Sequence, residues 1–224
     1  MVSKETLKFQ ADLTKNNNRD WFLENKPRYE KYKQEYHALI QKFLDAMIPL
    51  DENLRHLEIK DCSFRVNRDI RFSKDKTPYK THLGIWMSPG QKNTNLAGYY
   101  IHIEKGASFI AGGVYWPDAA DLKKIRAEID HFQEDLENIV ADKKFKEEFG
   151  GFDRDENNSL KSAPKGYDKE HPAIEFLRLK CFTASQSIDD KQLAEKDFVE
   201  KTAKKLIALK PLNDFLNRAL TSPQ

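Results

Sequence analysis

The sequence predicts an α+β fold, in which a central antiparallel meander of four or slightly more strands is flanked by N-terminal and C-terminal helices. Apolar residues recur at intervals of three and four near both ends of the chain, as in amphipathic helices. In the middle they alternate with polar residues, as in half-buried strands. A chain of 224 residues can bury most of its apolar surface around one core. We therefore expect a single domain over 1–224, with helices at about 3–49, a sheet at about 62–116 and further helices at about 118–220.

Composition narrows the class of protein. The formal net charge is only +2, which gives no overall field to attract nucleic acid or an anionic membrane. No apolar run reaches the length of a membrane span, and the first residues, MVSKETLKFQ, lack the apolar core of a signal peptide. We expect a cytoplasmic protein. Cys62 and Cys181 lie far apart without CxxC spacing, so both are expected to be small buried side chains.

The N-terminal part predicts two helices separated by a turn. Ser3 stands where an N-cap is expected before ETLKFQADL, and the run 16–18 (NNN) favours a turn. Pro27 suits the first turn of a second helix that ends near Pro49. Its apolar stripe consists of Tyr29, Tyr32, Tyr36, Leu39, Ile40, Phe43 and Met47.

Four runs in the middle predict the strands of the meander. The first starts near Cys62, where Phe64, Val66, Ile70 and Phe72 alternate with polar residues. The others are Tyr79–Met87, Ala97–Glu104 and Ser108–Tyr115. Their connections are short, which favours antiparallel neighbours.

The C-terminal part predicts mostly helices. Asp118 caps a long helix whose apolar spacing continues to Ile139. Residues 150–170 are polar and predict a loop, and His171-Pro172 opens a short helix through Leu179. Asp197–Leu209 and Pro211–Leu220 predict the closing helices.

The segment from Arg65 to His82, RVNRDIRFSKDKTPYKTH, is the most site-like stretch of the chain. Arginine and lysine side chains suit a phosphate or carboxylate ligand, and guanidinium groups bind such anions through two parallel hydrogen bonds. Strand alternation places Arg68 on the apolar face, which makes it the member expected to be structural. We predict binding of a phosphorylated or acidic small molecule, with these residues in contact with it: Arg65, Arg68, Arg71, Lys76, Tyr79, Lys80 and His82.

Three alternatives stay open for this segment. Asp69 and Asp75 can neutralise the arginines in a purely structural network, which would make the chain a non-enzymatic interaction domain. A metal-assisted phosphoester hydrolase is the second alternative, with Asp69, His82, His102 and Glu104 as ligands or acid/base groups. Nucleic-acid binding is the third, and the near-neutral charge disfavours it; its stacking surfaces would be Tyr79, Tyr99, Tyr100 and Trp86.

The stretch RVNRDIRFSKDKTPYKTHLG closely resembles the signature of a bacterial family known as domain of unknown function 2461. Similar blocks run through the chain: Asn18–Trp21 with Asn25-Lys26, GYYIHIEKGASFIAGGVYWP, and SAPKGYDKEHPAIEFLRLK. The resemblance implies a small single-domain bacterial protein. It implies no activity, cofactor, substrate or catalytic residue. Whether the protein is an enzyme, and its oligomeric state, are left open.

Overall fold

The computed structural model describes residues 1–222, and of Asn93 only the backbone. The chain forms two compact units. Unit 1 comprises residues 1–87, 100–110 and 187–204, and unit 2 comprises residues 88–99, 111–186 and 205–224. The expectation of a single domain over the whole chain stays a prediction.

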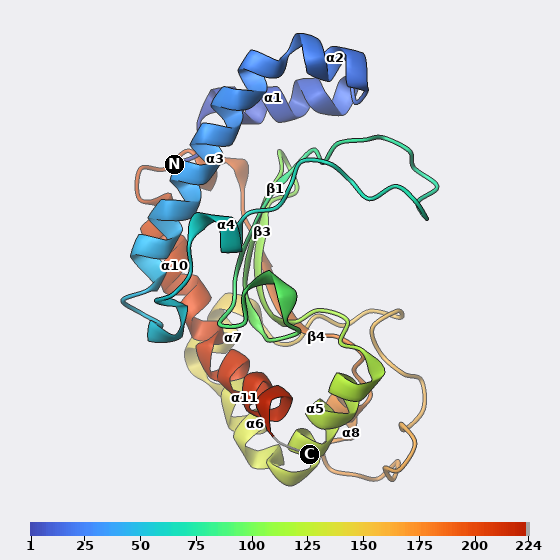
Figure 1. Cartoon of the computed structure of the whole chain (residues 1–224). Coiled ribbons are helices and arrows are strands. Elements are labelled where there is room, and N and C mark those ends of the chain that lie inside the picture. The colour runs from blue at the N-terminus through green and yellow to red at the C-terminus, as the bar shows by residue number, and fades with distance from the viewer. Residues whose placement is uncertain (223–224) are drawn as a thin grey trace. The chain divides into compact units, whose positions relative to one another are not determined.

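The sheet confirms the predicted α+β class. Four antiparallel strands follow the order β1-β2-β3-β4 (Figure 1). Their bounds are β1 Leu83–Met87, β2 Gly98–Ile103, β3 Phe109–Val114 and β4 Phe182–Ser187. The second, third and fourth predicted runs thus become β1, β2 and β3.

The first predicted strand is wrong. Residues 63–82 contain no strand, and only two isolated bridges occur there, Ser63 with Ile85 and Asn67 with Tyr79. The alternating pattern exists, but its apolar side chains are not buried, since Phe72 is 96% exposed. The fourth strand is instead β4, which lies in a stretch for which no strand was predicted. Phe182 and Ala184 of β4 are buried in strict alternation with less buried residues.

Two helices at the N-terminal end of unit 1 match the prediction, and the structure adds a short third helix between them, where none was predicted. They are α1 Lys4–Lys15, α2 Arg19–Glu24 and α3 Lys26–Met47. Ser3 caps α1 by accepting a hydrogen bond from the Thr6 N–H (3.0 Å), and Asn18 caps α2. The apolar stripe of α3 is buried except for Tyr29, which is half-buried, and the Phe9 ring lies 4.8 Å from that of Tyr32. Unit 1 also contains η1 Glu52–Leu54, α4 Ile59–Cys62, α9 Asp190–Leu193 and most of α10 Phe198–Leu206.

Unit 2 is built mainly from helices. They are η2 Gln91–Asn93, α5 Ala119–His131, α6 Gln133–Ala141, α7 Lys143–Phe149, α8 Ile174–Leu177, η3 Ile207–Leu209 and α11 Lys210–Thr221. The predicted single helix from Asp118 to Ile139 breaks at Phe132, whose backbone leaves the helical region at φ −126° and ψ 43°. The ring of Phe132 stays half exposed beneath the guanidinium of Arg218, 4.5 Å away. A continuous apolar spacing therefore did not guarantee a continuous helix.

Candidate functional site

Residues 63–82, called the arm below, form an open hairpin-like loop that leads into β1 (Figure 1). Two backbone hydrogen bonds join its outgoing and returning halves: Arg68 N–H donates to Pro78 O (2.9 Å), and Lys80 N–H donates to Val66 O (2.8 Å). Pairing is thus limited to the part of the arm nearest β1. The tip of the arm, residues 69–76, depends on side chains for its shape.

The base of the arm is fastened to the N-terminal helices. Asn17 donates from Nδ2 to Tyr79 O (2.8 Å) and accepts from Tyr79 N–H (3.1 Å) through Oδ1. The Tyr79 ring stacks on that of Phe22, with centroids 4.0 Å apart. Tyr79 is consequently buried and holds the arm in place.

Both central arginines of the arm have carboxylate partners. Arg68 donates from Nη1 to Asp75 and to the hydroxyl of Thr77. Arg71 forms a two-pronged pair with Asp69, with Nη2 to Oδ2 at 2.6 Å and Nε to Oδ1 at 2.9 Å. The Thr77 N–H and then Arg68 lower the pKa of Asp75 to about 2, and Arg71 lowers the pKa of Asp69. These pairs neutralise both arginines, but they lie largely at the surface, with the Arg71 side chain 76% exposed, so each contributes little to stability.

The remaining cations of the arm do not converge on one point. Lys76 donates from Nζ to Ile70 O (2.9 Å) at the tip. The Nζ of Lys80 lies 5.2 Å from the centroid of the Phe64 ring, and burial, with a smaller contribution from Arg65, lowers the Lys80 pKa. Arg65 is exposed. The predicted anion site is therefore divided between the tip and the base of the arm.

An open pocket of about 640 Å³ lies at the base of the arm. Of the seven predicted anion contacts, Arg68, Tyr79, Lys80 and His82 line it, whereas Arg65, Arg71 and Lys76 do not. Three carboxylates share the lining with two cations, so the lining carries a formal charge of −1 when His82 is neutral. The charged lining residues are Arg68, Lys80, Asp69, Asp75 and Glu104.

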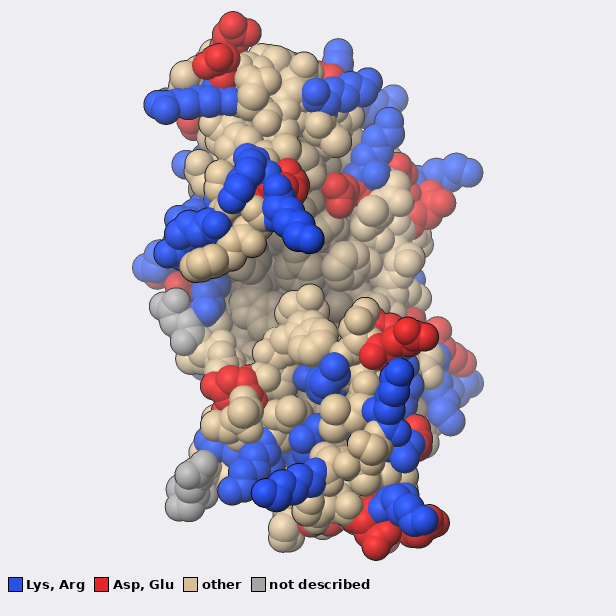
Figure 2. All heavy atoms as spheres, turned by 90° about the vertical axis from the view of Figure 1, so that its right-hand side faces the viewer, with Lys and Arg blue, Asp and Glu red and all other residues tan. Residues whose placement is uncertain are grey.

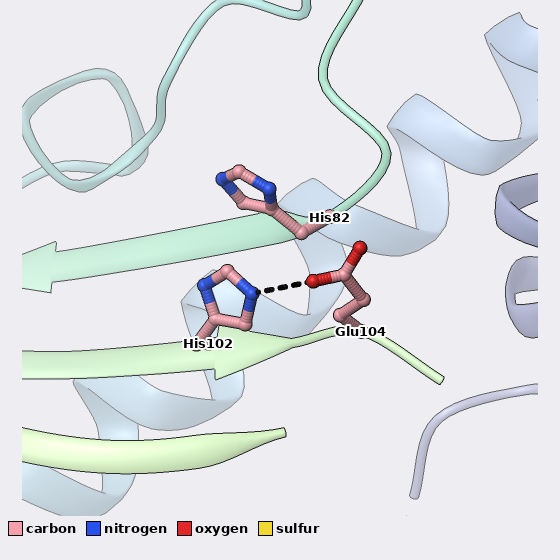
Figure 3. Close-up of side chains that lie close together, drawn as sticks. All are labelled: His82, His102 and Glu104. Carbon is pink, nitrogen blue, oxygen red and sulfur yellow. Dashed lines mark hydrogen bonds and ion pairs between the residues drawn. The ribbon is translucent and has the colours of Figure 1, made fainter. Parts of the chain in front are cut away.

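Three of the predicted metal ligands gather beside this pocket. His82 directly precedes β1, His102 lies on β2 and Glu104 follows β2, and their side chains point toward one another (Figure 3). One ligand atom from each lies within 4.8 Å of those of the other two. His102 Nε2 is 3.2 Å from Glu104 Oε2, and the rings of the two histidines are 4.3 Å apart. His82 and Glu104 also line the pocket.

Neighbouring side chains orient this cluster. The Tyr100 hydroxyl lies 3.1 Å from His102 Nδ1, and Thr81 donates from its hydroxyl to Glu104 Oε1 (3.1 Å). The Phe109 ring stacks on His102, with centroids 4.7 Å apart and an interplanar angle of 14°. His102 is held on both ring nitrogens and on one face, so its position is well defined.

Burial keeps the cluster suited to a cation. Desolvation, followed by the charge of His102, lowers the pKa of His82 to about 4, so His82 is neutral at physiological pH. Desolvation raises the pKa of Tyr100 to about 12, so its phenol keeps its proton. Neutral imidazole and ionised carboxylate are the forms that bind divalent metals.

The residues fit a divalent metal after a small adjustment. An ion about 2.1 Å from two ligand atoms holds those atoms roughly 3.4 Å apart in tetrahedral geometry, close to the His102–Glu104 separation. His82 would have to approach the other two. Metal at His102 Nε2 would replace the hydrogen bond to Glu104, and Nδ1–H would then donate to the Tyr100 oxygen.

Other predicted residues lie elsewhere. Asp69 lines the pocket and pairs with Arg71, but it is outside the three-residue cluster. Tyr79 and Tyr99 are buried, so these two cannot serve as stacking surfaces for nucleic acid. Sequence reasoning did not single out Asn17, Thr81 or the orienting role of Tyr100. The even spacing of Tyr100, His102 and Glu104 on one strand face was the available signal for Tyr100.

These features define an α+β protein with a histidine–carboxylate cluster beside an open, charged pocket. The chain belongs to the family of conserved hypothetical proteins DUF2461, whose profile matches residues 5–215. No match was found among curated proteins or among solved structures. Among the residues that the structure describes, no helix is both long enough and apolar enough to cross a bilayer.

Proposed function

We propose that the chain is a metal-assisted phosphoester hydrolase, in which His82, His102 and Glu104 hold a divalent metal and the pocket holds a small phosphorylated molecule. One observation carries the proposal: His82 and Glu104 belong both to the three-ligand cluster and to the lining of the pocket that contains Arg68 and Lys80. A metal held there would border the space that a substrate occupies.

The charges of the pocket favour a metal and an anion together. The formal charge of −1 on the lining does not by itself attract an anion. A divalent cation would change that charge to +1, and the lining would then attract an anion. The cations of the lining repel a metal, but Glu104 and two further carboxylates offset them. We therefore expect the anion to bind tightly only in the presence of metal.

Two side chains are placed to bind the substrate phosphate. Arg68 uses Nη1 for its contacts with Asp75 and Thr77, and this leaves its Nη2 for a ligand. Lys80 is half-buried and supplies a second positive charge. A bound metal supplies a Lewis acid and lowers the pKa of a bound water. In the net reaction the water oxygen bonds to phosphorus, the P–O ester bond breaks, and the alcohol leaves with a proton from that water.

Metal binding is tested by thermal unfolding of the purified chain with Zn²⁺, Mn²⁺ or Co²⁺, against chelator. Metal at about 100 times its dissociation constant should raise Tm by roughly 5 to 10 °C. His102→Ala should abolish this rise. His56→Ala is the matched control, because His56 is an exposed histidine of the same unit, and it should keep the full rise. Co²⁺ bound by His82 and His102 should also give a visible absorption band.

Anion binding and hydrolysis are tested separately. Inorganic phosphate should raise Tm further with metal present, and Lys80→Ala should remove this second rise while keeping the first. p-Nitrophenyl phosphate should be hydrolysed by the metal-loaded chain and not by His102→Ala. If phosphate raised Tm in chelator while no metal raised it, the chain would be a metal-free anion-binding protein and not a metal-assisted hydrolase. If neither phosphate nor metal raised Tm, the arginines of the arm would be part of a structural network and not of a ligand site.

A further inference from the structure

The tip of the arm holds an aromatic side chain in water. Phe72 is 96% exposed, although burying a phenylalanine side chain contributes about 1.5 to 3 kcal/mol. The other aromatic rings of this segment are much less exposed: Phe64 is 39% exposed, and Tyr79, which stacks on Phe22, is 8% exposed. An aromatic side chain with this much solvent exposure is a candidate for contact with a binding partner.

Hydrogen bonds fix the tip in this shape. Asp69 accepts from the backbone N–H of Arg71 (3.2 Å) as well as from its guanidinium. Asp75 accepts from the backbone N–H of Thr77 (2.9 Å), and Lys76 bonds Ile70 O. The two carboxylates thus bracket the turn that carries Phe72. The exposure of the ring follows from an ordered turn.

One cation lies close to the ring, and further exposed cations lie along the arm. The guanidinium carbon of Arg71 lies 5.8 Å from the centroid of the Phe72 ring. Arg65, Lys74 and Lys76 are exposed on the same arm. Figure 2 shows Lys and Arg side chains gathered on this part of the molecule, with acidic side chains beside them. Residues 65–80 carry six cations and two carboxylates, which gives a local formal charge of +4 in a chain of net charge +2.

We propose that the arm binds single-stranded nucleic acid, with a base stacked on Phe72 at its tip and phosphates held by the exposed Arg65 and Lys74. Stacking requires only one ring per base, and it tolerates any sequence. A bilayer surface fits less well, because Phe72 is the only large apolar side chain exposed at the tip in the described structure, and carboxylates flank it. The net charge of +2 disfavours nucleic-acid binding by the chain as a whole, but the formal charge of +4 on residues 65–80 favours it at the arm. The proposal does not rest on the metal site.

Fluorescence anisotropy with labelled dT12 and U12, in chelator at 50 to 200 mM salt, tests this interaction. Phe72→Ala should weaken binding by about 5-fold to 100-fold. Two phosphate contacts predict that log K falls with log salt with a slope of roughly −1.4, and Lys74→Ala should make this slope shallower. Both variants change exposed side chains, so their Tm should stay within about 1 °C of the wild type.

Two substitutions serve as matched controls. Tyr115→Ala removes another highly exposed aromatic ring, 75% exposed and in unit 2, and Lys105→Ala removes an exposed lysine of unit 1. Neither should change the affinity by more than about 2-fold. The proposal is overturned by an absence of binding at 50 mM salt, or by binding that Phe72→Ala leaves unchanged. Phe72-dependent sedimentation with phosphatidylserine vesicles, without oligonucleotide binding, would assign the tip to a membrane surface instead.

Discussion

His82 links the stability of the protein to pH. Its pKa is lowered from 6.5 to about 4 by burial and by the nearby charges of His102, Lys80 and Arg68, against the opposing charge of Glu104. Above pH 6.5 the histidine is neutral in both states and contributes nothing to the pH dependence. Below that pH the unfolded chain binds a proton that the folded chain does not. Stability should therefore decrease as the pH falls from about 6.5 to about 4.

The variant His82→Asn should remove this part of the pH dependence. The measurement is Tm of the wild type and the variant in chelator at several pH values. The Tm difference between wild type and variant should shrink as the pH falls from 7 to 4, since only the wild type loses this contribution. His56→Asn, at an exposed histidine of the same unit, is the matched control. A difference for His82→Asn that does not change with pH would mean that His82 titrates alike in both states.

At the residue scale, the cluster was predictable because it follows from strand periodicity. His102 lies on β2, Glu104 follows two residues later, just past the end of β2, and His82 directly precedes β1, the neighbouring strand of a short meander. Asp69 was named in the same set, but it lies outside the three-residue cluster and pairs with Arg71. The partner of Arg68, Asp75, lies in the same polar bend and was foreseeable as a neutralising carboxylate.

Strand β3 depends on a glycine at its point of closest approach to β4. Gly113 has φ +109°, and a Cβ added there would lie 1.9 Å from the carbonyl oxygen of Phe182. Backbone atoms cannot move aside cheaply. Gly113→Ala should therefore lower the free energy of unfolding by about 3 to 5 kcal/mol, from strain and overpacking together. Urea unfolding measures the loss.

Gly106→Ala separates backbone strain from crowding. Gly106 also has a positive φ, +77°, but a Cβ there meets nothing within 4 Å. Gly106→Ala should therefore lower the free energy of unfolding by only about 1 to 2 kcal/mol. If Gly113→Ala and Gly106→Ala lowered the free energy of unfolding equally, β3 and β4 would be able to move apart at little cost. In that case the close approach at Gly113 would not determine the pairing.

Elements defined by nearby residues were predicted well, and those defined by distant partners were not. Ser3 caps α1, and Pro27 lies in the first turn of α3, as local sequence indicates. β4 was missed because it pairs with β3 across a long connection of helices, and its polar residues Thr183 and Ser185 bond to Asp153. The alternation in 62–72 was read as a strand, but the segment lacks the continuous neighbour that a strand requires.

At the scale of the whole molecule, the question is whether the two units unfold together. Strands β2 and β3 each contribute residues to both units, so neither unit can unfold completely while both strands stay intact. We therefore expect one cooperative transition, in agreement with the single domain that the chain length predicts.

The two cysteines report on the units separately. Cys62 is 0% exposed and lies in unit 1, and Cys181 is 3% exposed and lies in unit 2. Buried thiols react only when the structure around them opens. The wild-type chain would be pulse-labelled with a thiol reagent at increasing urea, and each cysteine quantified by peptide mass spectrometry. Coinciding labelling midpoints are expected. If Cys181 became labelled at lower urea than Cys62, or the reverse, the two units would open in separate steps, and the expectation of one cooperative transition would be wrong.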